Sequence, residues 1–115
     1  MADEVKSIVE DATFDFAMGE NDQALAKLDK AVELDPKSFE AWHAIAEIHF
    51  STRQLDEALD AAQKAHEIRP DDIHIHTSLS RIYMERGDKI KAEEHGAKAR
   101  MLGWREQLQG ESEED

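Results

Sequence analysis

Six histidines among 115 residues make metal binding the first chemistry to consider in this sequence. His43 and Glu47 are four residues apart, so a helix would place both on one face, and His74 belongs to a neighbouring segment. Three nitrogen and oxygen ligands of this kind suit zinc, and imidazoles that titrate near neutral pH could make ligand binding pH-dependent. A metal- or pH-sensing module is therefore one hypothesis. The alternative is that these histidines are solvated or hydrogen-bonded and hold no metal or other cofactor.

Motifs for catalysis are absent from the sequence. It has no cysteine, and it has neither a glycine-rich phosphate-binding loop nor a nucleophile elbow. Its many carboxylates fall mostly on helix faces that we expect to be solvated, where nothing would perturb their acidity. We therefore predict a protein that is not an enzyme.

The charge of the chain restricts the partners that it can bind. Acidic side chains number 27 and basic ones 14, for a formal net charge of −13, which disfavours nucleic acid and anionic membranes. Residues 1–72 hold most of the acids, whereas bases outnumber acids over residues 73–104. The excess of acid is explained either by a surface suited to solubility or a salt-rich host, or by a basic protein partner.

No segment predicts export or membrane insertion. The N-terminal residues are acidic, without the basic and then apolar order of a signal peptide. No apolar run approaches the roughly 18 residues of a membrane-spanning helix. Together with the lack of cysteine, these features predict a cytoplasmic protein of a reducing compartment.

The chain repeats itself with a period of 34 residues, and this repeat must position any site. Segments 5–38, 39–72 and 73–106 align without gaps. Small side chains recur at equivalent positions of the three segments, where they would let two helices approach closely. The two columns that contain only alanine are Ala24, Ala58 and Ala92, and Ala31, Ala65 and Ala99.

Each segment divides into two helical patterns. We expect first helices at residues 7–18, 39–52 and 73–86, and second helices at 22–34, 56–68 and 89–102. Gly19 and Gly87 suit left-handed helix ends, and Ser38 and Asp72 suit helix N-caps. A proline two residues before each cap ends the preceding helix. The sequence predicts an all-α fold, a right-handed α-solenoid of three antiparallel helix hairpins with a short C-terminal cap.

The middle segment resembles the signature of the tetratricopeptide repeat through Trp42, Ile45, Ala46, Ala58, Ala65 and Pro70. The resemblance extends over residues 5–104, so that residues 1–104 form three repeats. The first segment departs from it with Asp11 and Asp15 where large apolar residues are expected. The third has His76 for the tryptophan and Trp104 for the proline. Terminal repeats often differ in this way because one of their faces meets water.

The resemblance implies a protein-interaction scaffold, or adaptor, that binds a peptide or a helix in a concave groove lined by the first helices. Phe16, Phe50 and Met84 would form an apolar ledge there, unless they pack against the second helices. Carboxylates beside the ledge favour a basic and apolar ligand. The predicted groove residues are Val9, Glu10, Thr13, Phe16, Glu40, His43, Glu47, Phe50, His74, Thr77, Ser78, Arg81 and Met84. The alternative is a fixed structural subunit of a larger complex, or a homodimer.

The end of the chain differs from the repeats. Residues 105–115 are polar and too few for another full helix, so we expect Trp104 and Leu108 to fold back as a short cap. Residues 110–115 are then expected to be disordered. Alternatively, this end docks on another subunit. Because the net charge of −13 opposes self-association, we expect a monomer in isolation.

Overall fold

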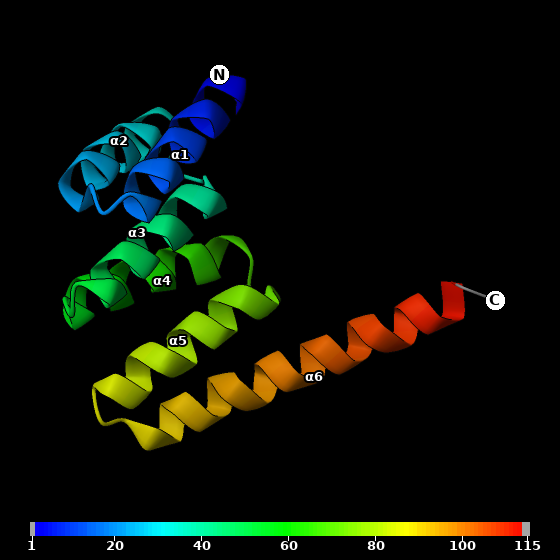
Figure 1. The fold of residues 1–115 in the computed structure, drawn as a ribbon. Coiled ribbons are helices and arrows are strands. Elements are labelled where there is room, and N and C mark those ends of the chain that lie inside the picture. The colour runs from blue at the N-terminus through cyan, green and yellow to red at the C-terminus, as the bar shows by residue number, and fades with distance from the viewer. Residues whose placement is uncertain (1, 114–115) are drawn as a thin grey trace.

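The computed structural model describes residues 2–113, and within them it contains six α-helices and no strand, which confirms the predicted all-α fold (Figure 1). The helices are α1 (Ala2–Ala17), α2 (Asn21–Leu34), α3 (Phe39–Ser51), α4 (Leu55–Ile68), α5 (Ile73–Glu85) and α6 (Lys89–Glu113). They form three consecutive antiparallel pairs, as expected. None of these helices combines the length and the apolar character that are needed to cross a bilayer.

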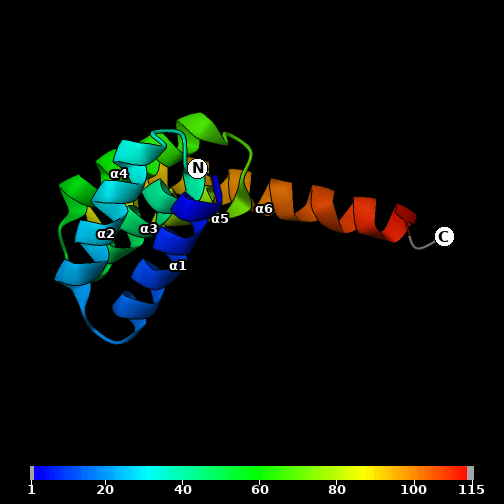
Figure 2. The ribbon, with the colours of Figure 1, turned by 90° about the horizontal axis from the view of Figure 1, so that it is seen from above.

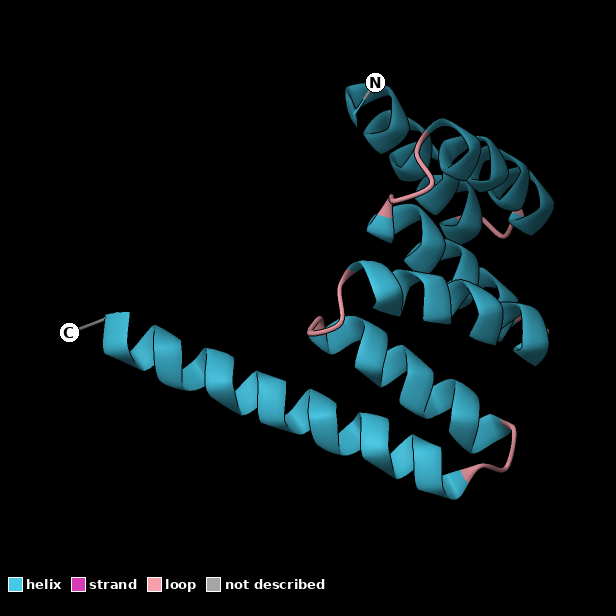
Figure 3. Ribbon diagram, turned by 180° about the vertical axis from the view of Figure 1, so that it is seen from behind, coloured by secondary structure: helices cyan, strands magenta, loops and turns pink. Residues whose placement is uncertain are grey.

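The three helix pairs are stacked one after another along the chain. Helix α3 contacts both helices of the first pair, and α5 contacts both helices of the second pair. Figure 1 shows α1 and α2 at one end of the stack and α5 and α6 at the other. Figure 2 shows the C-terminal part of α6 extending away from the other helices, and Figure 3 shows the short loops that join the helices. The three first helices therefore follow one another in the order α1, α3, α5.

Side chains cap two helices at the predicted positions. Ser38 Oγ accepts a hydrogen bond from the backbone N–H of Ala41 at 3.2 Å, and Asp72 Oδ1 accepts one from the N–H of Ile75 at 3.1 Å. Each bond satisfies an amide of the first turn that has no partner within the helix. Both predicted N-caps are confirmed. The largest difference at a helix start is in α1, which begins at Ala2 and not at residue 7.

Equivalent residues of the three hairpins adopt a left-handed backbone between the two helices. Gly19 and Gly87 have φ values of 82° and 86°, as the sequence predicts. The middle hairpin reaches the same conformation with Arg53, at a φ of 65°. A side chain is disfavoured in this region because its Cβ approaches the backbone, so Arg53 carries strain that the two glycines avoid.

The core lies where the second helix of each hairpin meets the first. Ala24 and Ala58 are completely buried and Ala92 is 1% exposed, so these recurring small side chains lie in the core. Larger aliphatic side chains fill the space between the hairpins. The largest of these that are fully buried are Leu28, Ile48, Ile75, Leu79 and Ile82. Each contributes about 1.5–3 kcal/mol through the loss of apolar surface from water.

Trp42, on which the family resemblance partly depends, is half-buried. Its indole Nε1 donates a hydrogen bond to the carbonyl oxygen of Pro36 at 2.8 Å. The ammonium of Lys64 lies 4.3 Å from the centre of its ring, within the range of a cation–π contact. The side chain therefore fixes the loop before α3 to the helix itself.

The C-terminal segment differs from the expected cap. Helix α6 continues to Glu113 without a break at residue 104 or 105, and Trp104 and Leu108 are 66% and 50% exposed. Neither side chain folds back onto the repeats. The physical reason is that Trp104 replaces the proline of the earlier repeats, so nothing ends this helix. The expected disorder begins at residue 110, but residues 110–113 are helical, and residues 114–115 lie outside the described part of the chain.

Substitution of Arg53 by glycine should stabilise the protein, because glycine adopts the left-handed conformation without strain. The guanidinium of Arg53 also pairs with Glu85 at 2.9 Å, an exposed contact worth about 0–1 kcal/mol. We therefore expect Arg53→Gly to raise the free energy of unfolding by about 1 kcal/mol in a Glu85→Gln background, measured by urea denaturation. If the double variant is no more stable than the Glu85→Gln variant alone, the loop carries no such strain.

Candidate peptide-binding surface

The predicted groove residues come from the three first helices, α1, α3 and α5. Helix α3 contacts both of the others, so its exposed side chains lie between those of α1 and α5. On each helix most of the predicted positions recur at intervals of three or four residues, which places them on one broad face. The predicted groove residues therefore lie on three neighbouring helices, and one of these residues, Ser78, is buried.

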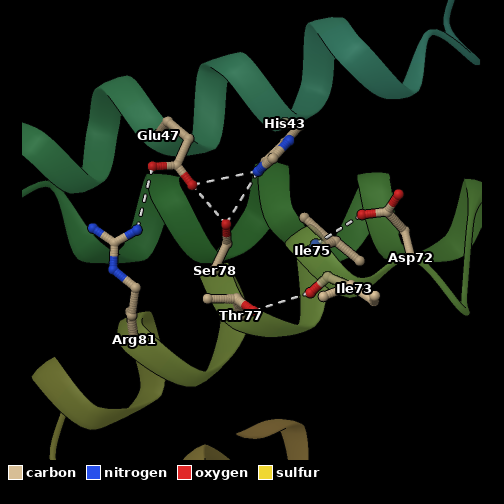
Figure 4. Close-up of polar contacts among 8 residues, drawn as sticks. All are labelled: His43, Glu47, Asp72, Ile73, Ile75, Thr77, Ser78 and Arg81. Carbon is tan, nitrogen blue, oxygen red and sulfur yellow. Dashed lines mark hydrogen bonds and ion pairs between the residues drawn. The ribbon is translucent and has the colours of Figure 1, made fainter. Parts of the chain in front are cut away.

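Four of the predicted residues form a polar cluster that joins α3 to α5 (Figure 4). Ser78 Oγ donates to Glu47 Oε1 at 2.6 Å, and His43 Nε2 lies 3.1 Å from the same Ser78 oxygen. His43 Nε2 is also 3.4 Å from Glu47 Oε1, and a guanidinium nitrogen of Arg81 is 3.6 Å from Glu47 Oε2. Figure 4 shows all four side chains pointing toward one another from two helices.

The hydrogen-bonding pattern determines which ring nitrogen of His43 carries a hydrogen. A hydroxyl has one hydrogen, and Ser78 donates it to the carboxylate of Glu47. The Ser78 oxygen and the Glu47 carboxylate therefore both act as acceptors toward His43 Nε2. His43 must carry its hydrogen on Nε2, whether its ring is neutral or charged.

This environment makes Glu47 a strongly acidic carboxyl group. The pKa of Glu47 is lowered from 4.5 to about 2, chiefly by the hydrogen bond from His43, and also by the Ser78 hydroxyl and by the charges of His43 and Arg81. Burial acts in the opposite direction, because it disfavours the charged carboxylate. Glu47 is therefore ionised throughout the physiological range and is already satisfied by its neighbours.

The apolar ledge is only partly available to a ligand. Phe16 and Phe50 are half-buried and pack against the core. The guanidinium of Arg81 covers Phe50, at 4.5 Å from the ring centre. Met84 is 51% exposed and is the accessible member of the ledge.

The predicted threonines are bonded within their own helices. Thr13 Oγ1 donates to the carbonyl of Val9 at 2.8 Å, and Thr77 Oγ1 donates to that of Ile73 at 3.1 Å. These bonds are local to one turn and do not join neighbouring repeats. Neither threonine belongs to the polar cluster.

An open cavity of about 580 Å³ lies between α1 and α3. Its buried lining is apolar, with Val5 and Phe39 each 5% exposed. The rest of the lining is partly buried or exposed and mostly charged. These residues are Lys6, Val9, Glu10, Asp35, Lys37, Glu40 and Arg69, with the buried cap Ser38 beside them.

Arg69 is a residue of this surface that the sequence analysis missed. It follows α4, and its guanidinium pairs with Glu40 at 3.0 Å and lies 4.6 Å from the centre of the Phe39 ring. We assigned the groove to the first helices alone, whereas Arg69 enters it from the connection to the next repeat. No periodic pattern in the sequence marks this pair.

The zinc alternative finds no support in the described residues. No three histidine, aspartate or glutamate side chains among residues 3–110 are arranged to hold a metal ion. His43 and Glu47 do lie together, but their facing atoms are engaged with each other and with Ser78. His74 is exposed on α5 and is not part of this cluster.

The low pKa of Glu47 predicts a loss of stability in acid. Because the folded-state pKa lies below the unfolded value, the stabilisation is complete above pH 4.5 and is lost as the pH falls toward 2. Glu47→Gln should lower the free energy of unfolding at pH 7 by about 1–2 kcal/mol, a value reduced for partial exposure to water. It should also flatten the pH dependence below 4.5, measured by denaturation.

Glu40→Gln serves as the matched control for this experiment. Glu40 is on the same helix and pairs with Arg69, but its side chain is 59% exposed. We expect a change of about 0–1 kcal/mol at pH 7. Equal effects of the two substitutions would contradict a special role of the polar cluster.

Comparison with known proteins agrees with this architecture. A family model described as "Tetratricopeptide repeat" matches residues 15–82. Human Superkiller complex protein 3 is 36% identical over 56 residues, which are 49% of this chain and 4% of that protein. This chain therefore spans a small fraction of the length of that relative.

Solved structures of MamA share the fold. One crystal structure of MamA superposes with a TM-score of 0.85 at 20% identity, over 90% of this chain and 61% of that one. MamA from Desulfovibrio magneticus RS-1 gives a TM-score of 0.79 at 22% identity, over 85% and 55% of the two chains. At these identities the likeness concerns the fold alone. Because the family model covers more than half of the sequence, and three stacked hairpins repeat its pattern, this chain belongs to the tetratricopeptide repeat family.

Proposed function

We propose that this chain is a non-catalytic adaptor that binds a segment of another protein across α1, α3 and α5. Tetratricopeptide domains are in general protein-interaction modules, and the chain belongs to this family. The observation that carries the finer proposal is the cavity between α1 and α3, which combines a buried apolar lining with an exposed charged one. Such a cavity suits one side chain of a peptide or helix with an aliphatic body and a polar end.

The polar cluster positions Met84, which we propose as a second part of the binding surface. His43, Glu47, Ser78 and Arg81 hold α3 and α5 in a fixed relation, so Met84 is presented at a set distance from the cavity. A ligand that contacts both features would need two apolar anchors. Because the surface is already ordered, little entropy is lost in organising it on binding.

The charge of the chain favours a basic ligand. The net charge of −13 attracts cationic segments over long distances, and exposed Glu10 lies at the edge of the cavity. Lys6 and Arg69 line the same cavity, so the attraction is general and not confined to one ion pair. The apolar anchors then supply most of the affinity, and the charges supply selectivity and approach rate.

A peptide array followed by calorimetry tests this proposal. We expect the selected peptides to combine lysine or arginine with one or two apolar residues. Met84→Ala should weaken the best of them about fivefold, equivalent to about 1 kcal/mol of lost apolar contact. Met18→Ala is the matched control, because Met18 is 65% exposed but lies outside the predicted groove, and it should leave the affinity unchanged.

Charge is tested with a second pair of variants. Glu10→Gln should mainly reduce the dependence of the affinity on salt, whereas Asp11→Asn, at the next exposed residue outside the predicted groove, should change it less. Selection of acidic peptides, or equal effects of Met84→Ala and Met18→Ala, would contradict the proposal.

A second candidate function is that of a fixed subunit in a larger assembly. The observation that favours it is the exposed apolar face of α6, where Met101, Trp104 and Leu108 are 55%, 66% and 50% exposed. Their spacing of three and four residues places them on one side of the helix. Apolar residues gathered in this way are typical of protein contacts.

Sedimentation of the isolated chain separates the two candidates. An adaptor with a net charge of −13 should sediment as a monomer of 13.1 kDa. A dimer of about 26 kDa that Trp104→Ser returns to the monomer mass would favour the fixed subunit. Ile90→Ser, at a residue that is 74% exposed near the start of α6, is the matched control and should not change the mass.

A further inference from the structure

Three histidines from three helices meet where the third hairpin packs on the second. His66 comes from α4, His76 from α5 and His95 from α6. The ring centres are 5.0 Å apart for His66 and His76, 5.2 Å for His76 and His95, and 5.9 Å for His66 and His95. We call these residues the histidine cluster, and none of them belongs to the predicted groove.

A backbone carbonyl group determines that one ring nitrogen of His76 carries a hydrogen. His76 is 4% exposed, and its Nε2 lies 2.6 Å from the carbonyl oxygen of Pro70. Because a carbonyl only accepts hydrogen bonds, His76 Nε2 carries a hydrogen. The bond reproduces the one from Trp42 Nε1 to Pro36 in the preceding repeat, so the histidine takes over the role of the indole N–H.

Only one hydrogen fits between the facing Nδ1 atoms of His76 and His95. The two Nδ1 atoms are 3.0 Å apart, so one must donate and the other must accept. With both rings charged, both Nδ1 atoms would carry hydrogens that point at each other. The geometry therefore allows at most one positive charge on this pair.

The surroundings of the cluster offer little compensation for further charge. His95 stacks on Tyr83 of α5 with ring centres 5.6 Å apart, and Lys91 of α6 is near the same tyrosine. The carboxylates that face His66 are Glu67 and Asp71, and the one that faces His95 is Glu94. Two cations already share Asp71, since Lys98 lies 3.5 Å and Arg105 3.9 Å from its oxygens.

We infer that the histidine cluster is an acid-sensitive contact that holds the third hairpin on the second and releases it when a second ring becomes charged. The three rings join α4, α5 and α6 while the cluster holds at most one proton beyond the neutral state. A second proton creates repulsion at 5–6 Å between ring centres, and the hairpins relieve it by separating.

The direction of the pH effect follows from two of the rings. Burial lowers the pKa of His66 and of His95 below the ordinary value of 6.5, and the charge of His76 lowers both further. The unfolded chain therefore binds more protons below pH 6.5 than the folded chain does. The contribution of the cluster to stability is complete above pH 6.5 and is lost as the pH falls below it.

The other repeats of the chain supply the substitutions for a test. His66 and His95 are equivalent to Val32 and Ala61, so His66→Val and His95→Ala introduce residues that already fit these positions. In the wild type, the unfolding equilibrium constant should rise by up to about 100-fold per pH unit below 6.5, for two protons taken up. The double variant should lose most of this rise, measured by denaturation between pH 7.5 and 5.5.

His74→Gln is the matched control, because His74 is exposed on α5 outside the cluster, and it should keep the wild-type pH dependence. Hydrogen exchange and imidazole NMR on the unmodified chain provide a test that needs no variant to fold. At pH 5.5 the amides of α5 and α6 should lose protection before those of α1 and α2, and the His66 and His95 rings should titrate below 6.5.

The inference would be overturned by wild-type stability that is equal at pH 7.5 and 5.5, or by an unchanged pH dependence in the double variant. Uniform amide protection along the chain at pH 5.5 would overturn it as well. None of these measurements involves a ligand, so they are independent of the proposed adaptor function. If the acid-sensitive contact and the adaptor function are both correct, acid would also separate Ser78 and Arg81 from α3 and so disrupt the candidate binding surface.

Discussion

Close contact between helices across buried alanines is the constraint on which the rest of this structure depends. Ala24, Ala58 and Ala92 lie in the second helices, and each is almost completely buried. A larger side chain there would push the two helices of a hairpin apart, because the interior has no spare volume. The next hairpin packs on both helices, so the displacement would reach the surface that α1, α3 and α5 share.

Helix α5 is held in the stack by polar contacts of two kinds. Ser78 faces the α3 carboxylate of Glu47, while His76 faces the imidazoles of α4 and α6. Two residues along a helix correspond to a rotation of about 200°, so these side chains leave α5 on different faces. Glu47 loses its negative charge only in strong acid, whereas the histidine cluster takes up protons below pH 6.5 but at higher pH than Glu47 does. The packing of the third repeat is thus tied to pH through two groups that titrate in separate ranges.

Equivalent residues of the three first helices differ in burial according to the place of their hairpin in the stack. Ile48 and Ile82 are each 1% exposed, because another hairpin covers them. Phe14 is the equivalent residue of α1 and is 66% exposed, since it lies on the outer face of the first hairpin. The same position of the repeat is therefore core in the second and third hairpins and exposed apolar surface on the first.

The sequence by itself determined the six helices, the N-caps Ser38 and Asp72, the left-handed glycines and the burial of the alanines. All of these depend on local geometry or on a period that recurs three times. Only the tertiary structure decided that the charge of Glu47 is compensated by its neighbours, that Arg69 lines the cavity beside α3 and that histidines of α4, α5 and α6 meet. These contacts join side chains that come from different helices or loops, and each occurs once. A periodic pattern contains no information on such pairs, because they depend on the rotation and distance between packed helices.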